Sequence, residues 1–258
     1  KNASNLGEVI GKKIGPFFRS KIKIQKNLEY SNIGNSEQDR ELIVKKMWGN
    51  YGRILSEYIF LKQFRKNNLS QFIKIEGSHV LNEIKKNDEQ VVFVSGHFNN
   101  FELMAMEIEK AEIKLCAIYR PLNNLFLNII MEKIRKNYIC KYQVKKGKSG
   151  TRELINFFKN GYSVALMIDQ RVSEGERINF FNKPALTTTL PAQLSLKYNL
   201  NVVPVFIQRR NNTFVIEFYK NIKASDYKDK INITKKLNNV IEKMITKNPS
   251  QWIWTHNR

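Results

Sequence analysis

The sequence has few cysteines and no long apolar run. Cys116 and Cys140 lie far apart among apolar or basic neighbours. Two cysteines are too few for a disulfide framework, and their spacing does not suit a zinc site, so we expect buried, reduced thiols. No stretch approaches the ~18 to 20 apolar residues that span a bilayer. The first residue is Lys1 rather than methionine, so an upstream signal or membrane anchor is compatible with this sequence.

Acidic residues are scarce relative to basic ones. The 258 residues include 44 Lys and Arg against 23 Asp and Glu, a formal charge of +21. With 42% hydrophobic residues the chain can bury a substantial core, which excludes a disordered protein. The positive excess therefore indicates an acidic partner: nucleic acid, an anionic membrane or an acidic protein.

The positive charge is concentrated in two segments. Residues 1–26 have seven basic side chains and one acid, and residues 135–152 have seven basic side chains and no acid. A lysine-rich composition that covers the whole surface is the alternative explanation. The first segment also places large apolar residues at helical spacing as far as Pro16 and just beyond: Leu6, Val9, Ile10, Ile14, Phe17 and Phe18.

This amphipathic arm has two interpretations. It lies on an anionic membrane, or it packs as a helix on its own domain. Gly7, Gly11 and Gly15 repeat every four residues, a pattern that is only weak evidence for helix pairing outside a membrane span.

Alternating elements predict an α/β fold: a mostly parallel sheet flanked by helices, with a helical N-terminal region (1–70) before the α/β domain (71–258). A capping box at Ser36 and Asp39 begins a helix that we expect to end near residue 68. Strands are predicted at 72–75, 91–95, 113–118, 162–168 and 202–207, and helices at 78–86, 99–110, 123–137, 149–159, 188–198 and 232–247. Asn211-Asn212 predicts an antiparallel C-terminal hairpin.

The clearest chemical signal follows the strand at 91–95. The strand ends in Gly96 and His97, and active sites of open α/β sheets lie at such carboxyl ends. Glu102 lies five positions on, so it reaches His97 only if His97 precedes a helix that contains Glu102, with Asn99 or Asn100 as N-cap. A carboxylate that fixes the imidazole tautomer makes the other ring nitrogen a general base. Ser95 is not part of a nucleophile-elbow motif, so the sequence gives little support to a covalent serine mechanism.

Five ordered blocks resemble the lysophospholipid acyltransferase superfamily, and most closely its late acyltransferases of bacterial lipid A biosynthesis. The resemblance, which includes the basic amphipathic start, covers nearly the whole chain. The blocks are His97 to Glu102; Ile118-Tyr119-Arg120-Pro121 with Asn123; Met167-Ile168-Asp169 with Phe180-Phe181 and Pro184 to Thr187; Leu200 to Arg209; and Pro249 to Arg258. Asn182 departs from the pattern, because a glycine is expected after the Phe-Phe pair.

The resemblance implies an O-acyltransferase without a cofactor. His97 would deprotonate a hydroxyl of the acceptor lipid, with Glu102 as its orienting partner. Arg135 would face a phosphate or the oxyanion and Asp169 would order the cations, while Arg120, Arg152 and Arg171 are candidates for substrate binding. The implied donor is acyl carrier protein, the acceptor a phosphorylated glycolipid, and the location the cytoplasmic face of the bacterial inner membrane, where the chain would be peripheral or anchored through a preceding segment.

The sequence has alternative interpretations. Within the same chemistry, the donor could be acyl-CoA and the acceptor another glycolipid or a lysophospholipid. A basic nucleic-acid-binding protein is the rival from another class, although zinc-finger, helix-turn-helix and RNP-like motifs are absent from the sequence. A metal-dependent hydrolase would need ligands that three scattered histidines, His79, His97 and His256, do not supply.

Overall fold

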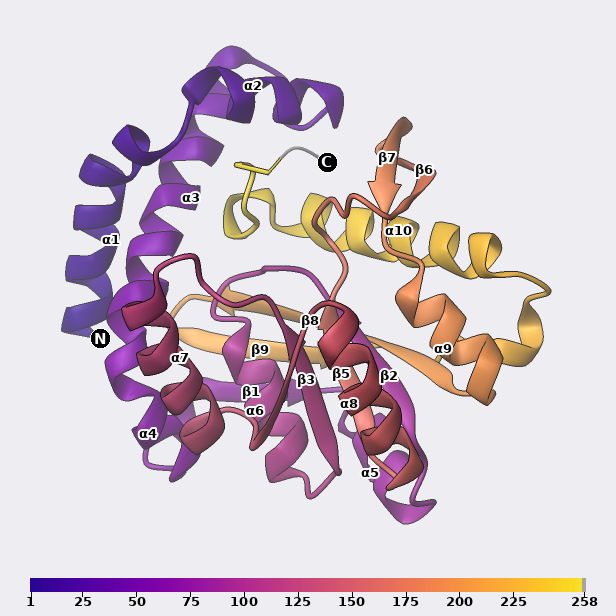
Figure 1. Cartoon of the computed structure of the whole chain (residues 1–258). Coiled ribbons are helices and arrows are strands. Elements are labelled where there is room, and N and C mark those ends of the chain that lie inside the picture. Colours follow the sequence, from indigo (N-terminus) through magenta and orange to yellow (C-terminus); the bar gives the residue numbers. More distant parts are fainter. Residues whose placement is uncertain (257–258) are drawn as a thin grey trace.

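A seven-stranded sheet forms the centre of the molecule (Figure 1). The computed structural model describes residues 1–256 and, within them, all side chains except those of residues 148, 149 and 151. The sheet strands are β1 (Ile73–Glu76), β2 (Val91–Ser95), β3 (Leu115–Tyr119), β4 (Tyr142–Lys145), β5 (Ser163–Met167), β8 (Asn201–Arg210) and β9 (Thr213–Phe218). Their order is β1-β9-β8-β2-β5-β3-β4. Only β8 and β9 among these neighbours pair antiparallel, so the predicted fold class is confirmed.

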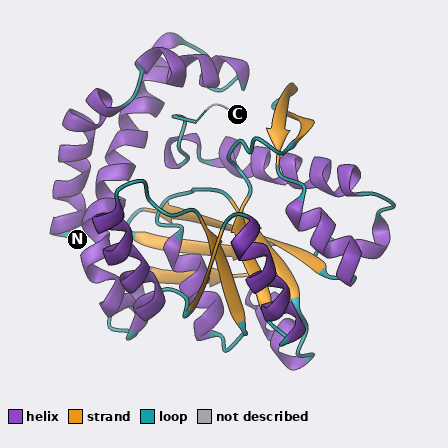
Figure 2. Ribbon diagram, viewed as in Figure 1, coloured by secondary structure: helices purple, strands orange, loops and turns teal. Residues whose placement is uncertain are grey.

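Helices surround the sheet on several sides (Figure 2). They are α1 (Asn2–Ile14), α2 (Lys21–Tyr30), α3 (Glu37–Glu57), α4 (Leu61–Arg65), α5 (Ser78–Lys86), α6 (Glu102–Lys110), α7 (Leu125–Tyr138), α8 (Lys148–Lys159), α9 (Leu190–Tyr198) and α10 (Lys230–Lys247). All five residues of β2 are buried, as expected for a central strand with helices on both faces. The predicted capping box is present at Ser36, but the helix that it begins ends at Glu57 rather than near residue 68.

A small hairpin, β6 (Glu176–Phe180) and β7 (Lys183–Thr187), stands apart from the main sheet and was not predicted. Its two turn residues both have positive φ, +48° at Phe181 and +60° at Asn182. Two-residue turns of this kind need left-handed conformations, which asparagine adopts more readily than most residues. Asn182 therefore fills the position where a glycine was expected, and the turn is retained.

The glycine repeat of α1 packs directly on α3. A Cβ atom added at Gly52 of α3 would lie 1.9 Å from the carbonyl oxygen of Gly7, and one added at Gly11 would lie 2.3 Å from that of Trp48. The two backbones meet because neither helix has a side chain at the crossing. Large apolar side chains of α1 outside this contact are exposed: Leu6, Val9, Ile10 and Ile14. Packing on the domain thus occupies one face of the arm only.

We predict that Gly52→Ala destabilises the protein. Helix propensity alone would make alanine about 1 kcal/mol more favourable than glycine, whereas the clash with the Gly7 backbone should cost about 1–3 kcal/mol. Gly49→Ala is the matched control in the same helix, because its added Cβ meets only side-chain methylenes of Glu8 and Lys12. Urea unfolding of both variants measures the difference, and a stabilised Gly52→Ala would contradict the close crossing.

Candidate active site

The carboxyl ends of β2 and β5 bring His97 and Asp169 together. In the register of this parallel pair Ser95 lies opposite Met167, and each functional residue follows two positions later. The Nδ1 atom of His97 lies 2.8 Å from Oδ1 of Asp169, and the backbone N–H of His97 donates to Oδ2 at 2.8 Å. The Phe101 ring packs against the imidazole in an edge-to-face arrangement, with the ring centroids 4.9 Å apart.

Asp169 is fully buried and accepts a third hydrogen bond. The indole Nε1 of Trp252, from the C-terminal segment, donates to Oδ2 at 2.8 Å. Burial opposes ionisation of this carboxyl, but the charge of His97 and the three donors outweigh burial and hold its pKa well below the usual range. A carboxylate of this kind fixes the imidazole with Nδ1 as donor, so Nε2 keeps its lone pair.

The protonated form of His97 is favoured by this arrangement. Burial lowers its pKa, yet the Asp169 carboxylate and its hydrogen bond raise the pKa above the ordinary 6.5, and the charge of Glu102 adds to this effect. The stability gained from the pairing of His97 is therefore complete below pH 6.5 and is lost as the pH rises through the raised value.

Glu102 does not orient His97 by a hydrogen bond, contrary to the sequence-based expectation. Its Oε1 accepts from Arg135 of α7, at 2.9 Å from Nε and 2.6 Å from a terminal nitrogen, and from the hydroxyl of Tyr58 at 2.5 Å. All three side chains are largely shielded from solvent. Glu102 thus compensates a buried guanidinium beside the His97 site and acts on the imidazole only through its charge.

The two asparagines after His97 do not cap α6. Helix α6 begins at Glu102 without a side-chain cap. Instead, the Asn99 amide donates to Asn50 of α3 at 3.0 Å and to Gln251 at 2.8 Å, and Asn99 itself has a positive φ of +39°. Asn100 donates to Glu57 at 3.3 Å. These buried amides fix the loop that presents His97 to α3 and to the C-terminal segment.

Gln170 and His256 also belong to the site, and the sequence patterns did not single them out. The Gln170 amide nitrogen lies 3.3 Å from Nδ1 and 3.5 Å from Nε2 of His97, and 3.0 Å from Nε2 of His256. Burial lowers the pKa of His256, which favours its neutral form. The available signal was position: Gln170 directly follows Asp169, and His256 closes the Trp252-Ile253-Trp254-Thr255-His256 run.

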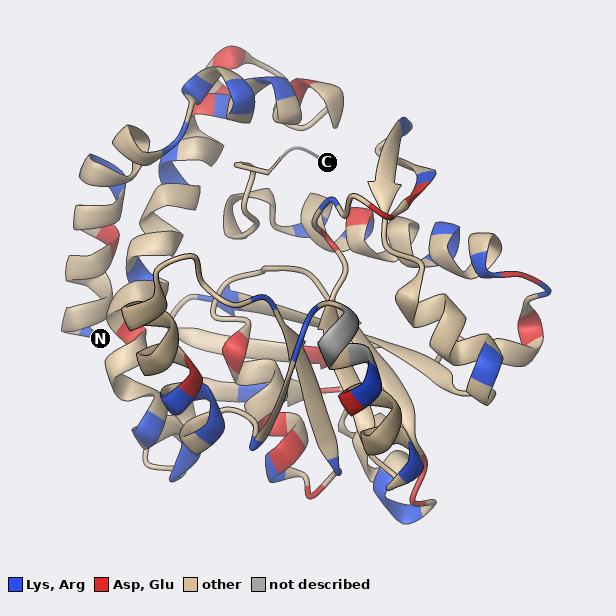
Figure 3. Cartoon of the chain, viewed as in Figure 1, with Lys and Arg blue, Asp and Glu red and all other residues tan. Residues whose placement is uncertain are grey.

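The other predicted arginines are exposed. Arg120 follows β3 and Arg171 follows Gln170, so both lie at the same edge of the sheet as His97, while Arg152 is on α8. Lys146 follows β4, and its backbone N–H donates to the carbonyl of Tyr119 at 2.8 Å. Burial, and to a smaller extent the charge of Arg120, lower the pKa of Lys146. Figure 3 shows basic residues along the loops at this edge.

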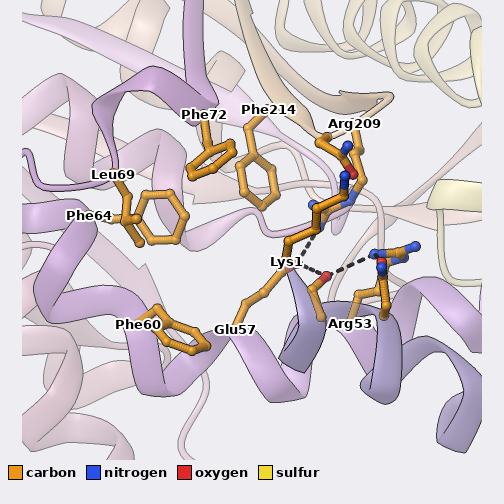
Figure 4. A pocket seen from close by; sticks show the side chains of 12 residues that line it. Lys1, Arg53, Glu57, Phe60, Phe64, Leu69, Phe72, Arg209 and Phe214 are labelled. Carbon is orange, nitrogen blue, oxygen red and sulfur yellow. Dashed lines mark hydrogen bonds and ion pairs between the residues drawn. The ribbon is translucent and has the colours of Figure 1, made fainter.

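A cavity of about 110 Å³ lies beside the loop but does not include His97 (Figure 4). Aromatic side chains form one end of it, and Arg53, Arg209 and Glu57 form the other. Arg209 donates to Glu57 at 2.7 Å, and the same Glu57 carboxylate receives the Asn100 amide. The cavity therefore adjoins the residues that support the site, not the reactive imidazole.

The described residues give little support to thiol-dependent or metal-dependent chemistry. Both cysteines are buried and unpaired, and burial raises the pKa of Cys140 to about 12, which suppresses the reactive thiolate. Among residues 1–256, apart from the three undescribed side chains, no three His, Cys, Asp or Glu side chains converge on a metal position.

No described helix is both long and apolar enough to cross a bilayer.

Residues 1–258 match the family model described as "Bacterial lipid A biosynthesis acyltransferase". The chain belongs to this family. It is therefore an acyltransferase of lipid A biosynthesis.

Several known proteins are similar to this acyltransferase. The lipid A biosynthesis palmitoleoyltransferase of Escherichia coli is 24% identical over 98% of this chain and 83% of its own length. The myristoyltransferase of the same organism is 22% identical over 97% and 77%. The crystal structure of a 1-acyl-sn-glycerophosphate acyltransferase from Thermotoga maritima is 13% identical, with a TM-score of 0.45, over 96% of this chain and 97% of that one.

We predict that the pKa of His97 lies above 6.5 and that Asp169→Asn lowers it. The amide removes the negative charge that favours imidazolium but leaves the burial that disfavours it. NMR titration of the His97 ring protons measures both values. Glu102→Gln is the control and should lower the pKa less, because Glu102 makes no hydrogen bond to the ring. A larger effect of Glu102→Gln would contradict the assignment of Asp169 as the partner.

Proposed function

We propose that this acyltransferase moves a fatty acyl chain from an acyl carrier protein thioester to a hydroxyl of a phosphorylated lipid A precursor. The observation that carries the proposal is the pairing of His97 with the buried Asp169 carboxylate at the carboxyl ends of β2 and β5. This pairing leaves the Nε2 atom of a half-buried imidazole to act as a general base.

In the proposed reaction His97 accepts one proton and later gives it back. Nε2 of His97 removes the proton of the acceptor hydroxyl while its oxygen attacks the thioester carbonyl. Asp169 stabilises the imidazolium that forms, since its carboxylate stays ionised. The tetrahedral intermediate collapses by breaking the carbon–sulfur bond, and the imidazolium returns the proton to the departing thiolate. The products are the acyl ester and the free carrier thiol.

Arg135 is proposed to face the developing negative charge or a substrate phosphate. Two of its nitrogens are held by Glu102, so the guanidinium has a fixed orientation near His97, and its charge opposes protonation of the imidazole. Fixed positive charge in a site shielded from water stabilises an oxyanion more than a mobile side chain does. Glu102 would then be a positioning residue that acts through Arg135.

The exposed cations along the sheet edge are proposed to receive the phosphorylated parts of the substrates. Strand order places Arg171 beside the His97 site, Arg120 after the next strand and Lys146 after the strand beyond it. Arg152, exposed on the helix α8 that follows β4, belongs to the same basic segment; the side chain of Lys148 lies outside the described ones. Such a row suits the phosphates of a glycolipid and the acidic surface of a carrier protein.

Association with the cytoplasmic face of the inner membrane is proposed from the outer face of α1. Its apolar side chains are exposed, as are Phe17 and Phe18 in the turn that follows, and basic residues lie among them. A helix with these two components binds anionic lipid surfaces.

We predict that His97→Ala abolishes measurable acyl transfer and that Asp169→Asn lowers kcat by about 10²–10⁴-fold. In Asp169→Asn the imidazole loses its tautomer constraint and the partner of its imidazolium. Mass spectrometry of a lipid A precursor, incubated with acyl carrier protein thioester, measures transfer. Ser95→Ala is the control, since Ser95 donates to the Val205 carbonyl and is proposed to take no part in the reaction. Equal transfer by His97→Ala and the wild type would end the proposal.

The donor is tested by charge reversal at the basic row. For Lys146→Glu combined with Arg152→Glu we expect KM for the carrier thioester to rise about tenfold or more at low salt, with the difference lost at high salt. KM for acyl-CoA should change less, because CoA lacks an extended acidic surface. Lys235→Glu with Lys236→Glu makes the same charge change on exposed positions of α10 and is the control. Equal KM effects from both pairs would refute carrier docking at this row.

A further inference from the structure

The N-terminal half of α7 presents a large apolar surface without a protein partner among the described residues. Leu125 is 75% exposed, Phe126 82%, Ile129 67% and Ile130 55%. These four positions form two adjacent pairs, and the pairs are about one helical turn apart, so all four lie on one side of the helix. Leu122 and Leu127 beside them are exposed as well, and no described residue of α7 is buried. Exposed apolar patches of this size mark interaction surfaces.

The opposite side of α7 is tied to the site by polar contacts. Glu132 accepts from the hydroxyl of Tyr119 at 2.5 Å and from the amide of Asn128 at 2.8 Å. One turn further on, Arg135 holds Glu102. The helix is thus anchored through one face, and its orientation relative to His97 is fixed while the apolar face points outward.

The charged residues of α7 favour an anionic lipid surface as the partner of this apolar face. Beyond the apolar turns the outer side of α7 continues with exposed Lys133 and Lys136, and the only acid of the helix, Glu132, is engaged on the inner side. Figure 3 shows uncharged upper turns of α7 above a charged lower end. An apolar end followed by lysines is the arrangement by which interfacial helices insert side chains and contact anionic headgroups.

Elements linked to α7 also have exposed apolar side chains. Leu55 and Ile59, at the end of α3 and just after it, are exposed and flank Tyr58. Tyr58 bonds the same Glu102 carboxylate that Arg135 holds. Helix α1, whose outer face is apolar too, packs on α3, and all three elements lie on the left side of the molecule in Figure 1.

We propose that α7 is a second lipid-inserting element, which docks on an anionic bilayer and orients the His97 site toward it. The inference rests on the proposed function in one respect: the bilayer is then the source of the acceptor lipid. Because Arg135 and the inserted residues share one helix, lipid contact and the position of the guanidinium near His97 are mechanically linked.

The test compares two double variants at exposed positions. Phe126→Ser with Ile129→Ser removes the inserting side chains, and Phe126→Leu with Ile129→Leu keeps them apolar. Sedimentation with vesicles of phosphatidylethanolamine and phosphatidylglycerol should show binding weakened about tenfold or more for the serine pair only. Melting temperatures should remain close to the wild type, because neither position is buried. Equal vesicle binding by the three proteins would overturn the inference.

Two further measurements distinguish lipid insertion of α7 from self-association of the chain and from failure of the proposed function. Sedimentation velocity without lipid reports self-association: a dimer that only the serine pair dissociates would overturn the inference and assign the face to a second copy of the chain. Acyl transfer is then assayed with the acceptor in vesicles and in detergent micelles; we expect the serine pair to lose transfer in vesicles and retain it in micelles. No transfer by any variant in either form would refute the proposed function, while a vesicle-binding difference would still support insertion of α7.

Discussion

The buried carboxylate of Asp169 is the interaction on which the site depends. It accepts from the His97 backbone, the His97 ring and the Trp252 indole, so it joins β2, β5 and the C-terminal segment. A buried charge without such partners would cost several kcal/mol, so the three segments must come together for the carboxylate to stay ionised. The same segment is held from the other side, because Asn27 of α2 donates to the carbonyls of Trp254 and His256 at 2.8 Å each.

The sequence predicted the strand before His97 and paired this histidine with Glu102, whereas the structure has the His97 ring hydrogen-bonded to Asp169. Glu102 is near in sequence and a helix could have brought it close. The actual partner is 72 positions away and is selected by strand register, which no local pattern encodes. One signal was available: His97 and Asp169 each follow a buried strand at the same offset. Neighbouring parallel strands place such residues together, but sequence alone does not say that β2 and β5 are neighbours.

Helix α7 was predicted at 123–137 and is observed at Leu125–Tyr138, yet its environment was not predicted. Apolar periodicity looks the same whether a stripe faces the core, a lipid surface or another protein. In α1 the glycines pack on α3 and the apolar side chains stay exposed, so packing on the domain is observed and binding to a membrane stays a prediction. The division at residue 70 remains a prediction, since residues on both sides of it share one core.

The tautomer of His97 tests the central claim most directly. With Asp169 accepting from Nδ1, the neutral ring must carry its proton on Nδ1 and leave Nε2 unprotonated. Nitrogen-15 chemical shifts of the two ring atoms, measured on the full chain above the pKa of His97, distinguish the tautomers. The account predicts an Nδ1–H tautomer that becomes mixed in Asp169→Asn and persists in Glu102→Gln. A neutral ring protonated at Nε2 would contradict it, because no base would then face the acceptor hydroxyl.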